Sequence, residues 1–434
     1  MSLTALLGMI VLMAPRRFAI VAFFALGCFV SQSQRIVIAG LDFDFIRILV
    51  IVGITRIAIR GEFHSLKIRR QDVLLVLFVL TSTIAMMIRI GSSGLTNRLG
   101  FALNALGLYF CFRCWVKSKD DFVFVMMFLA LLLIPVSTFF FIEKVTGRNP
   151  FAFLGGVPEF TAIRNGRLRC QGAFSHAILA GVFFASLVPV YGGMYLGQVC
   201  ARWKCILGGA LSLLVVFFTS SSTPISAVII GAIGWLAFPL RREFRIIRWG
   251  ILIGAICLHF VMKKGVWHLL ARIDFVGGST GWHRYYLIDR AVANLDEWWA
   301  FGVASTDHWG HGLYDVTNQY IVEGTRGGLL AVVFLFLIII TAFSNIGKTI
   351  KRQKSRQDQF LLYGIGVLLL VHMCVFISVS YFGQIIMWWY FTLASIESLS
   401  EESESEQLPA SSIARHRPRS RRTERRPTPG MELT

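Results

Sequence analysis

Charged residues are scarce in this 434-residue chain, and acidic residues are the scarcest of them. Asp, Glu, Lys and Arg make up 15% of the sequence, whereas soluble globular domains usually carry about 25%. Hydrophobic residues reach 55%, and the mean hydropathy is +0.65. This composition excludes a water-soluble globule and predicts an integral membrane protein.

The shortage of acidic residues leaves a formal net charge of +19, from 43 Lys and Arg against 24 Asp and Glu. In a soluble protein this excess would favour a nucleic-acid partner. In a membrane protein it first indicates cytoplasmic loops, which are rich in Lys and Arg. We therefore expect no nucleic-acid partner.

Disulfide frameworks and metal motifs are also lacking. Five of the eight cysteines lie in or beside apolar runs, where a thiol behaves as a small hydrophobic group. Cys111 and Cys114 form a C-x-x-C pair, but no second Cys or His pair lies near enough to complete a zinc site. Walker and Rossmann motifs are absent as well. We predict no metal and no cofactor.

Apolar stretches are abundant, and a helix needs about 20 such residues to cross a bilayer. Those of spanning or near-spanning length are 3–14, 18–31, 43–60, 72–90, 99–115, 121–142, 173–196, 204–219, 224–240, 247–263, 327–346, 360–380 and 383–398. The first is short for a span, and neither a preceding basic residue nor a cleavage site marks it as a signal peptide. We predict an all-α, polytopic membrane protein with 12 or 13 transmembrane helices.

Basic residues set the predicted orientation, because they group after every odd-numbered segment, as at Arg16 and Arg17 or at residues 348–356. Such loops are cytoplasmic. The chain then divides into helices over 1–263 with a basic outer loop at 143–172, a large extracytoplasmic loop at 264–326, C-terminal helices over 327–400 and a disordered cytoplasmic tail at 401–434. Arginines at 415–426 either contact anionic membrane lipid or merely solubilise the tail.

The large outer loop concentrates aromatic residues. It holds five of the eleven tryptophans and four of the ten tyrosines, namely Trp267, Trp282, Trp298, Trp299, Trp309, Tyr285, Tyr286, Tyr314 and Tyr320. Aromatic rings with polar neighbours suit the apolar faces of sugars, although an interfacial aromatic belt explains single tryptophans equally well. Their concentration in one loop favours a binding role.

Two arginines at the outer face are candidates for binding an anion. Residues 280–299 read as a helix capped by Ser279 or Thr280, and Arg284 continues its apolar stripe, where it must snorkel or meet an anion. Arg169 stands just before the helix that begins near residue 173, and helix N-termini favour phosphate. An interfacial anchor is the alternative for Arg169.

These residues together resemble a known family. The pattern Arg169-x-x-Gly172-x-Phe174 opens a helix, Gly281-x-x-Arg284 lies in a large outer loop, and Asp315 to Ile321 precede Gly327-Gly328 and another spanning helix. In order, topology and loop size, roughly residues 40 to 345 resemble the O-antigen ligase and O-antigen or exopolysaccharide polymerase superfamily of GT-C type membrane glycosyltransferases.

The resemblance implies a metal-independent, inverting glycosyltransferase on the outer face of the bacterial inner membrane. It would polymerise oligosaccharide repeats carried on undecaprenyl pyrophosphate, with Arg169 and Arg284 holding the pyrophosphate and with a chain-length regulator as an optional partner. Gly172, Asn318, Trp282, Trp309 and Tyr320 join the predicted substrate site.

The chain departs from the family at one position. Ligases carry a His directly before the loop Asn, and here that position is Thr317. The candidates for the catalytic base are therefore Asp315, His311, His308 and Glu323, and the sequence does not choose among them.

Three other functions stay open. A ligase would transfer the glycan to a lipid or other acceptor with the same arginines. A transporter or flippase of lipid-linked glycans is disfavoured, because no predicted span carries Asp or Glu near its middle. A peptidoglycan glycosyltransferase shares the many-helix plan but fits the outer-loop motifs less well.

Overall fold

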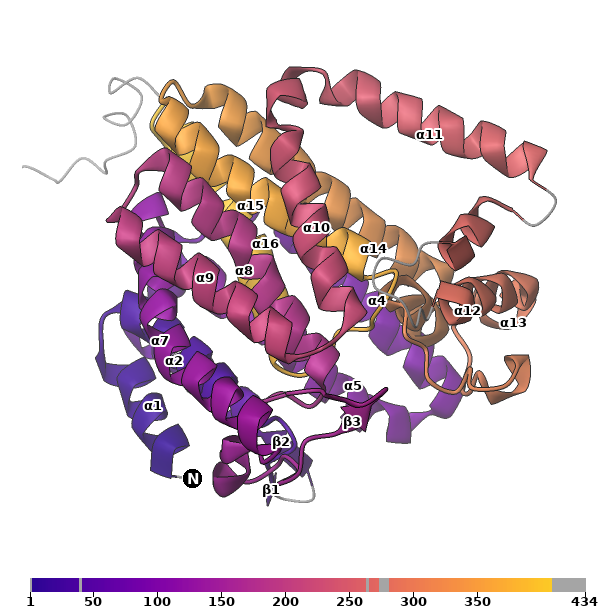
Figure 1. Ribbon diagram of the computed structural model, residues 1–434, viewed down its shortest axis with the longest axis horizontal. Coiled ribbons are helices and arrows are strands. Elements are labelled where there is room, and N and C mark those ends of the chain that lie inside the picture. The colour runs from indigo at the N-terminus through magenta and orange to yellow at the C-terminus, as the bar shows by residue number, and fades with distance from the viewer. Residues whose placement is uncertain (1, 39–40, 263–264, 273–280, 408–434) are drawn as a thin grey trace, which may run out of the picture.

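The computed structural model describes residues 2–38, 41–262, 265–272 and 281–407, and these residues are overwhelmingly helical (Figure 1). The N-terminal helices are α1 (Ser2–Met13), α2 (Arg16–Phe29), α3 (Phe45–Arg60), α4 (Arg70–Ile90), α5 (Ser92–Ala102), α6 (Leu108–Trp115) and α7 (Lys119–Thr146). The C-terminal helices are α8 (Ala177–Gly197), α9 (Arg202–Phe218), α10 (Ser222–Leu236), α11 (Phe244–Val261), α12 (Gly281–Ala293), α13 (Leu295–Trp298), α14 (Gln319–Arg352), α15 (Arg356–Val375) and α16 (Gln384–Ser405).

Short elements connect these helices. A π-helical turn, η2 (Leu103–Gly107), joins α5 to α6, and 3-10 turns occur at η1 (Glu62–Ser65), η3 (Pro150–Leu154), η4 (Phe238–Arg242), η5 (Val266–Arg272) and η6 (Asp307–Trp309). Two small antiparallel hairpins pair β1 (Arg35–Ile38) with β2 (Leu41–Asp44) and β3 (Ile163–Arg164) with β4 (Arg167–Leu168).

Six of the described helices are long and apolar enough to cross a membrane. They are α4, α7, α8, α11, α14 and α15, and α1 and α10 are shorter apolar helices. Every apolar stretch found in the sequence forms a helix over most of its length. These observations confirm an all-α, multi-pass membrane protein, whereas the count of 12 or 13 spans stays a prediction.

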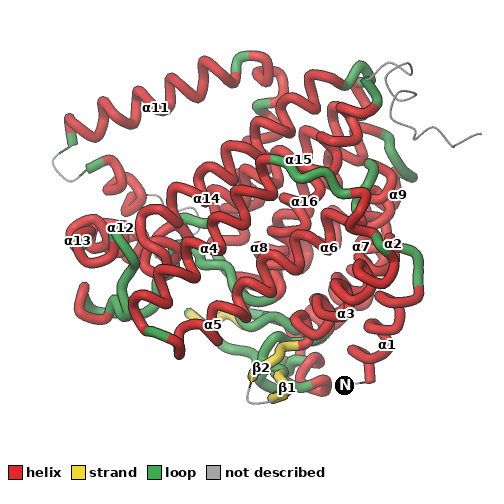
Figure 2. Tube along the Cα trace, turned by 180° about the vertical axis from the view of Figure 1, so that it is seen from behind, coloured by secondary structure: helices red, strands yellow, loops and turns green. Residues whose placement is uncertain are grey.

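Helix α8 lies at the centre of the molecule. It is apolar all round, and most of its residues are buried, as expected for a helix with neighbours on every side. Helices α9, α10 and α15 pack against it (Figure 1). By contrast, α11 buries none of its residues and stands away from the rest of the bundle (Figures 1 and 2).

The connections predicted to be cytoplasmic contact one another through ion pairs. Arg16 and Arg17, at the start of α2, pair with Asp121 at the start of α7. Arg69, before α4, pairs with Glu404 near the end of α16 at 2.8 Å. The loops that the sequence assigns to one side of the membrane thus gather at one end of the bundle.

Candidate functional site

A cavity of about 1140 Å³ is formed by the connections predicted to face outward. Its lining comes from the loop before α8 and the start of α8, from the junction of α9 and α10, from α12 and the segment before α14, and from the connection between α15 and α16. The polar lining residues are Lys144, Arg164, Asn165, Arg167, Arg169, His176, Ser220, Ser221, Ser222, Thr223, His283, Arg284, Asp315, Thr317, Ser378 and Ser380. The volume slightly exceeds the usual range of small-molecule pockets, about 300–1,000 Å³.

The β3–β4 hairpin supplies three of the arginines. Asn165 and Gly166 form its two-residue turn with φ of 51° and 71°, the positive values that Asn-Gly turns adopt readily. Arg164 and Arg167 are paired across the hairpin, and the N–H of Arg169 extends the ladder by donating to the carbonyl of Ala162 at 2.9 Å. Because strand side chains alternate, Arg164, Arg167 and Arg169 share one face, and all three line the cavity.

Arg169 and Arg284 meet at a run of hydroxyl residues between α9 and α10. This hydroxyl segment is Thr219, Ser220, Ser221, Ser222 and Thr223. Arg169 Nη2 donates to Ser221 Oγ at 3.2 Å, and Arg284 Nη2 donates to Thr223 Oγ1 at 3.0 Å. The two arginines predicted from separate outer loops are therefore held by residues two positions apart.

The charge on Arg169 survives its partial burial. Burial lowers its pKa, and the nearby Arg164 guanidinium lowers it further. An arginine pKa starts so far above neutrality that the group stays cationic. The cost of holding this charge in a half-buried place is consistent with an anionic ligand.

Lys144 fixes the hydroxyl segment to the loop that carries the arginines. Its Nζ donates to the carbonyl of Leu168 at 2.9 Å and to Ser220 Oγ at 2.8 Å. Beside this contact, the N–H of Cys170 donates to the carbonyl of Phe218 at 3.3 Å. The sequence placed Lys144 in a basic loop, but gave no indication that it joins two loops.

Gly172 lies beneath the cavity and does not line it. It has φ of +58°, and a Cβ there would lie 2.4 Å from a ring carbon of Phe140. Its N–H donates to Glu143 Oε2 at 2.9 Å, and its carbonyl accepts from Asn149 Nδ2 at 2.8 Å. Only glycine fits this turn without strain, so the structure shows Gly172 shaping the loop behind Arg169.

His176 links the arginine loop to the central helix. Its Nδ1 accepts the N–H of Ile178 at 3.1 Å, which makes it the N-cap of α8. Burial lowers the pKa of His176, Arg169 and Arg164 lower it further, and Asp315 opposes them. The neutral ring with its proton on Nε2 satisfies the cap, so a hydrogen-bond donor is available at the cavity wall.

Of the four candidates for the base, only Asp315 lines the cavity. His308 Nε2 lies 2.7 Å from Glu297 Oε2 on the surface, and His311 is exposed outside the cavity. Glu323 is buried in α14, where its Oε1 accepts from Gln319 Nε2 at 2.6 Å. Geometry therefore favours Asp315.

The other predicted substrate residues lie outside the cavity lining. Asn318 caps α14 by accepting the N–H of Ile321 at 3.2 Å, and the Tyr320 hydroxyl donates to the carbonyl of Met373 at 2.9 Å. Trp309 is buried and donates to Glu297 Oε2 at 3.0 Å. Trp282 is 59% exposed. A contact between these residues and sugar stays a prediction.

One side of the cavity is apolar. It is lined by Ile178, Leu179, Leu213, Val216, Phe217, Ile225, Val228, Val379 and Phe382. Helices α9 and α10 both pack on α8 but touch each other little, and Phe217 on α9 is 70% exposed. The cavity thus offers both a cationic and an apolar surface, which suits an amphipathic anion.

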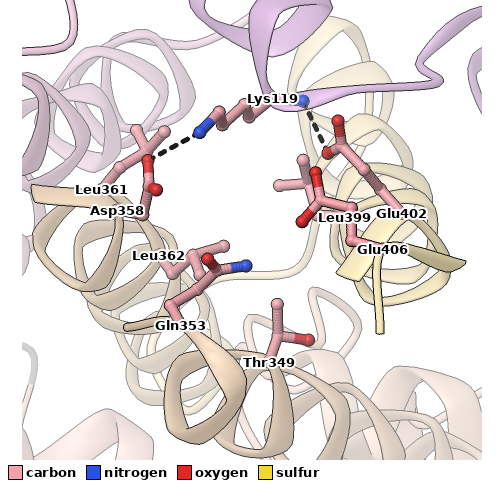
Figure 3. Close-up of a pocket in the computed structure, with 9 residues that line it drawn as sticks. All are labelled: Lys119, Thr349, Gln353, Asp358, Leu361, Leu362, Leu399, Glu402 and Glu406. Carbon is pink, nitrogen blue, oxygen red and sulfur yellow. Dashed lines mark hydrogen bonds and ion pairs between the residues drawn. The ribbon is translucent and has the colours of Figure 1, made fainter. Parts of the chain in front are cut away.

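A second, much smaller cavity lies at the opposite end of the bundle, among α7, α14, α15 and α16 (Figure 3). Lys119 Nζ donates to Asp358 Oδ1 at 2.9 Å, and the Lys119 N–H donates to Glu402 Oε2 at 2.9 Å. Its volume of about 20 Å³ holds little more than one water molecule. This small cavity lies within a contact between helices and is not a substrate site.

Within the described ranges, no group of three or more His, Cys, Asp and Glu side chains is arranged to hold a metal ion. No model of a known protein family and no curated protein matches this chain.

Proposed function

We propose that the protein is a membrane glycosyltransferase that polymerises oligosaccharide repeats carried on a polyprenyl pyrophosphate. The reaction would take place on the outer face of the bacterial inner membrane. One observation carries the proposal: Arg169, Arg284 and Asp315, which come from two separate outer loops of the sequence, line one cavity.

The two arginines suit a pyrophosphate leaving group. Negative charge builds on the pyrophosphate oxygens as the bond to the anomeric carbon breaks, and fixed cations lower the barrier by neutralising it. Each guanidinium presents a planar fork of donors that can bind phosphate oxygens in pairs. Ser221 and Thr223 accept from Arg169 and Arg284 and so orient the two forks.

Asp315 supplies the proton acceptor in this proposal. A hydroxyl of the acceptor sugar attacks the anomeric carbon, the bond from that carbon to the pyrophosphate oxygen breaks, and the hydroxyl proton passes to the Asp315 carboxylate. In-line attack inverts the anomeric configuration. A positioned base of this kind contributes about 10²–10⁴-fold to the rate.

The apolar wall supports the lipid part of the donor. Leu213 and Phe217 on α9 and Val228 on α10 line the side of the cavity where these two helices touch each other little. A polyprenyl chain entering there would stay against apolar side chains while its pyrophosphate reaches the arginines. A soluble sugar nucleotide would gain nothing from this wall.

The test replaces each arginine in cells that make the polymer. Arg169→Ala and Arg284→Ala should each lower polymer formation by about 10²–10³-fold, since each removes a fixed donor to developing charge. Lys at either position should restore little, because it lacks the planar fork. Membrane levels of each variant are measured alongside.

Arg290→Ala is the matched control, because Arg290 lies on α12 outside the cavity and stacks on Tyr286. It should leave polymer formation near normal. Polymer of normal amount and length in either cavity variant would falsify the proposed role of the arginines. Loss of glycan transfer to a lipid acceptor, with short polymer retained, would instead assign the chain as a ligase.

A further inference from the structure

Arg164 and Arg167 face each other at the wall of the cavity, and the hairpin fixes them there. Their strands are joined by two residues only, and the register pairs the two arginines directly. Directly opposed residues on one face of a hairpin have Cβ atoms about 4.5–5.5 Å apart. Their guanidinium groups can therefore reach one anion together.

This arrangement costs free energy when no anion is present, since like charges placed directly opposite destabilise a hairpin. Among the described residues, neither Arg164 nor Arg167 forms an ion pair. Arg148 in the same loop pairs with Glu159 at 3.6 Å. The loop thus contains an acidic residue, but Glu159 pairs with Arg148, and neither of these two residues lines the cavity.

The cavity also carries more positive charge than a pyrophosphate requires. Among the described residues, five cationic side chains line it, Lys144, Arg164, Arg167, Arg169 and Arg284, against one carboxylate, that of Asp315. A pyrophosphate diester bears one negative charge on each phosphate, which Arg169 and Arg284 match. Lys144 is bound to neutral oxygens of the protein. Arg164 and Arg167 are left for another anion.

Arg164 is exposed on the hairpin and lines the same cavity as Arg169 and His176. Its charge acts on both Arg169 and His176, so it lies close to the pyrophosphate end of the proposed site. The arginines form one row along the hairpin face, with Arg169 at the hydroxyl segment and the other two beyond it.

We propose that Arg164 and Arg167 form a second anion subsite that binds a carboxylate on the glycan, so that the substrate is an acidic oligosaccharide. The inference rests on the proposed function and adds the class of sugar. The shared chemistry is an anionic oxygen group, which a sugar carboxylate or a lipid headgroup phosphate could supply. The subsite takes the sugar carboxylate.

The test measures binding of trigalacturonic acid, and of its neutral methyl ester, to the full-length protein in nanodiscs of phosphatidylcholine. The acid should bind at least about tenfold more tightly than the ester. Arg164→Gln with Arg167→Gln should remove that difference, whereas Arg290→Gln should keep it. Affinity of the acid should also fall steeply with salt, because the contact is ionic.

A second arm separates this inference from the proposed function. Inorganic pyrophosphate is titrated into the native protein, into the Arg164/Arg167 variant and into an Arg169→Gln, Arg284→Gln variant. The variant without Arg169 and Arg284 should lose pyrophosphate binding. The variant without Arg164 and Arg167 should lose more of its affinity for trigalacturonate than of its affinity for pyrophosphate. If pyrophosphate binds through Arg169 and Arg284 but the acid and ester bind equally, the acidic-sugar subsite is refuted and the proposed function stands.

If the native protein did not bind pyrophosphate, the proposed function itself would be refuted. A third arm repeats the acid titration in nanodiscs that contain phosphatidylglycerol. Unchanged affinity supports a glycan site. The contrary result would be that phosphatidylglycerol abolishes binding of the acid and that Arg164→Gln with Arg167→Gln restores it. This result would assign the two arginines to a lipid headgroup and overturn the subsite.

Discussion

At the scale of single residues, the candidate site depends on hydroxyl groups that direct arginines. Ser221 is the N-cap of α10, yet its side chain makes no cap hydrogen bond and instead accepts from Arg169. Thr223 accepts from Arg284 in the same way. A guanidinium carries five N–H donors in a planar fork, and the hydroxyl that accepts from it sets the direction of that fork.

Removing these hydroxyls should slow the reaction while the arginines remain. For Ser221→Ala combined with Thr223→Val we expect kcat to fall about tenfold, equivalent to about 1.4 kcal/mol, with a smaller change in KM, because the forks lose orientation but keep their charge. Steady-state kinetics of polymer elongation measure this. Ser222→Ala is the matched control, because Ser222 lines the cavity without a side-chain hydrogen bond to either arginine.

A tenfold rise in KM with kcat unchanged would contradict this positioning role. The conservative substitution Ser221→Thr keeps a hydroxyl at this position and should retain most of kcat. A purely structural role would move the melting temperature instead, which is measured in parallel.

The sequence marked Arg169, Arg284 and Asp315 as candidates because each stands in a motif that resembles a family pattern. It missed Ser221, Thr223 and Lys144, since their importance depends on which loops meet in space. The available signal was the run of five hydroxyl residues at 219–223 between two apolar segments, which is an unusual composition for a short turn. Such a run has no assigned partner until the fold brings arginines to it.

At the scale of helices, the periodicity of apolar residues predicted where helices form better than where they begin. The stretch 173–196 becomes α8, but the helix starts at Ala177 because Gly172 at φ +58° directs the chain into a turn and His176 caps it. The stretch 327–346 becomes part of α14, which begins at Gln319 because Asn318 caps it. Gly328, at φ 73° and ψ −177°, is non-helical and separates two helical segments of α14, and the predicted stretch corresponds to the second of them.

The predicted helix over 280–299 is broken into α12 and α13 at Asn294, and its predicted caps, Ser279 and Thr280, lie outside the described residues. The β3–β4 hairpin was not foreseen, although Asn165-Gly166 is a strong turn signal. Strands of two residues are too short to show alternation. These small elements nevertheless position the arginines.

The cap of α8 should make stability depend on pH. The pKa of His176 is lowered in the folded protein, so the unfolded chain binds its proton more readily, and stability falls as pH drops through the unfolded pKa of about 6.5. His176→Asn keeps a good N-cap without a titrating group. We expect the melting temperature of the native protein to fall more than that of this variant between about pH 7.5 and about pH 5.5, the range in which an ordinary imidazole gains its proton.

Thermal unfolding in detergent at several pH values measures the difference between the two proteins. Taking the difference cancels the other titrating groups. If the melting temperature of His176→Asn depended on pH as that of the native protein does, protonation of His176 would have no effect on the cap.

At the scale of the whole molecule, the chain divides its polar contacts between two ends. Ion pairs such as Arg113 with Glu401 at 2.6 Å and Arg352 with Glu404 at 2.8 Å tie the helices at one end. The cationic cavity lies among the connections at the other end. Much of the excess positive charge of the chain lies in loops predicted to be cytoplasmic, and a smaller, concentrated part lines the cavity.

This division predicts which residues are reached from outside the cell. Cysteines are placed at His308 and at Gln407, both exposed, in a background with Ser at Cys200, Cys257 and Cys374. If the cavity faces outward as proposed, a membrane-impermeant maleimide applied to spheroplasts should label the first at once and the second only after permeabilisation. The reverse pattern would place the cavity in the cytoplasm, where the proposed reaction would have to be abandoned.

The proposed reaction is the elongation of a lipid-linked glycan in the cavity. The most direct measurement reconstitutes the purified protein in vesicles with a polyprenyl-pyrophosphate-linked oligosaccharide and follows product length and released polyprenyl pyrophosphate together. We predict longer glycans with one carrier released per bond formed, and loss of both products with Arg169→Ala or Asp315→Asn. Movement of the lipid-linked glycan across the vesicle membrane without elongation would contradict the proposed reaction and identify a transporter.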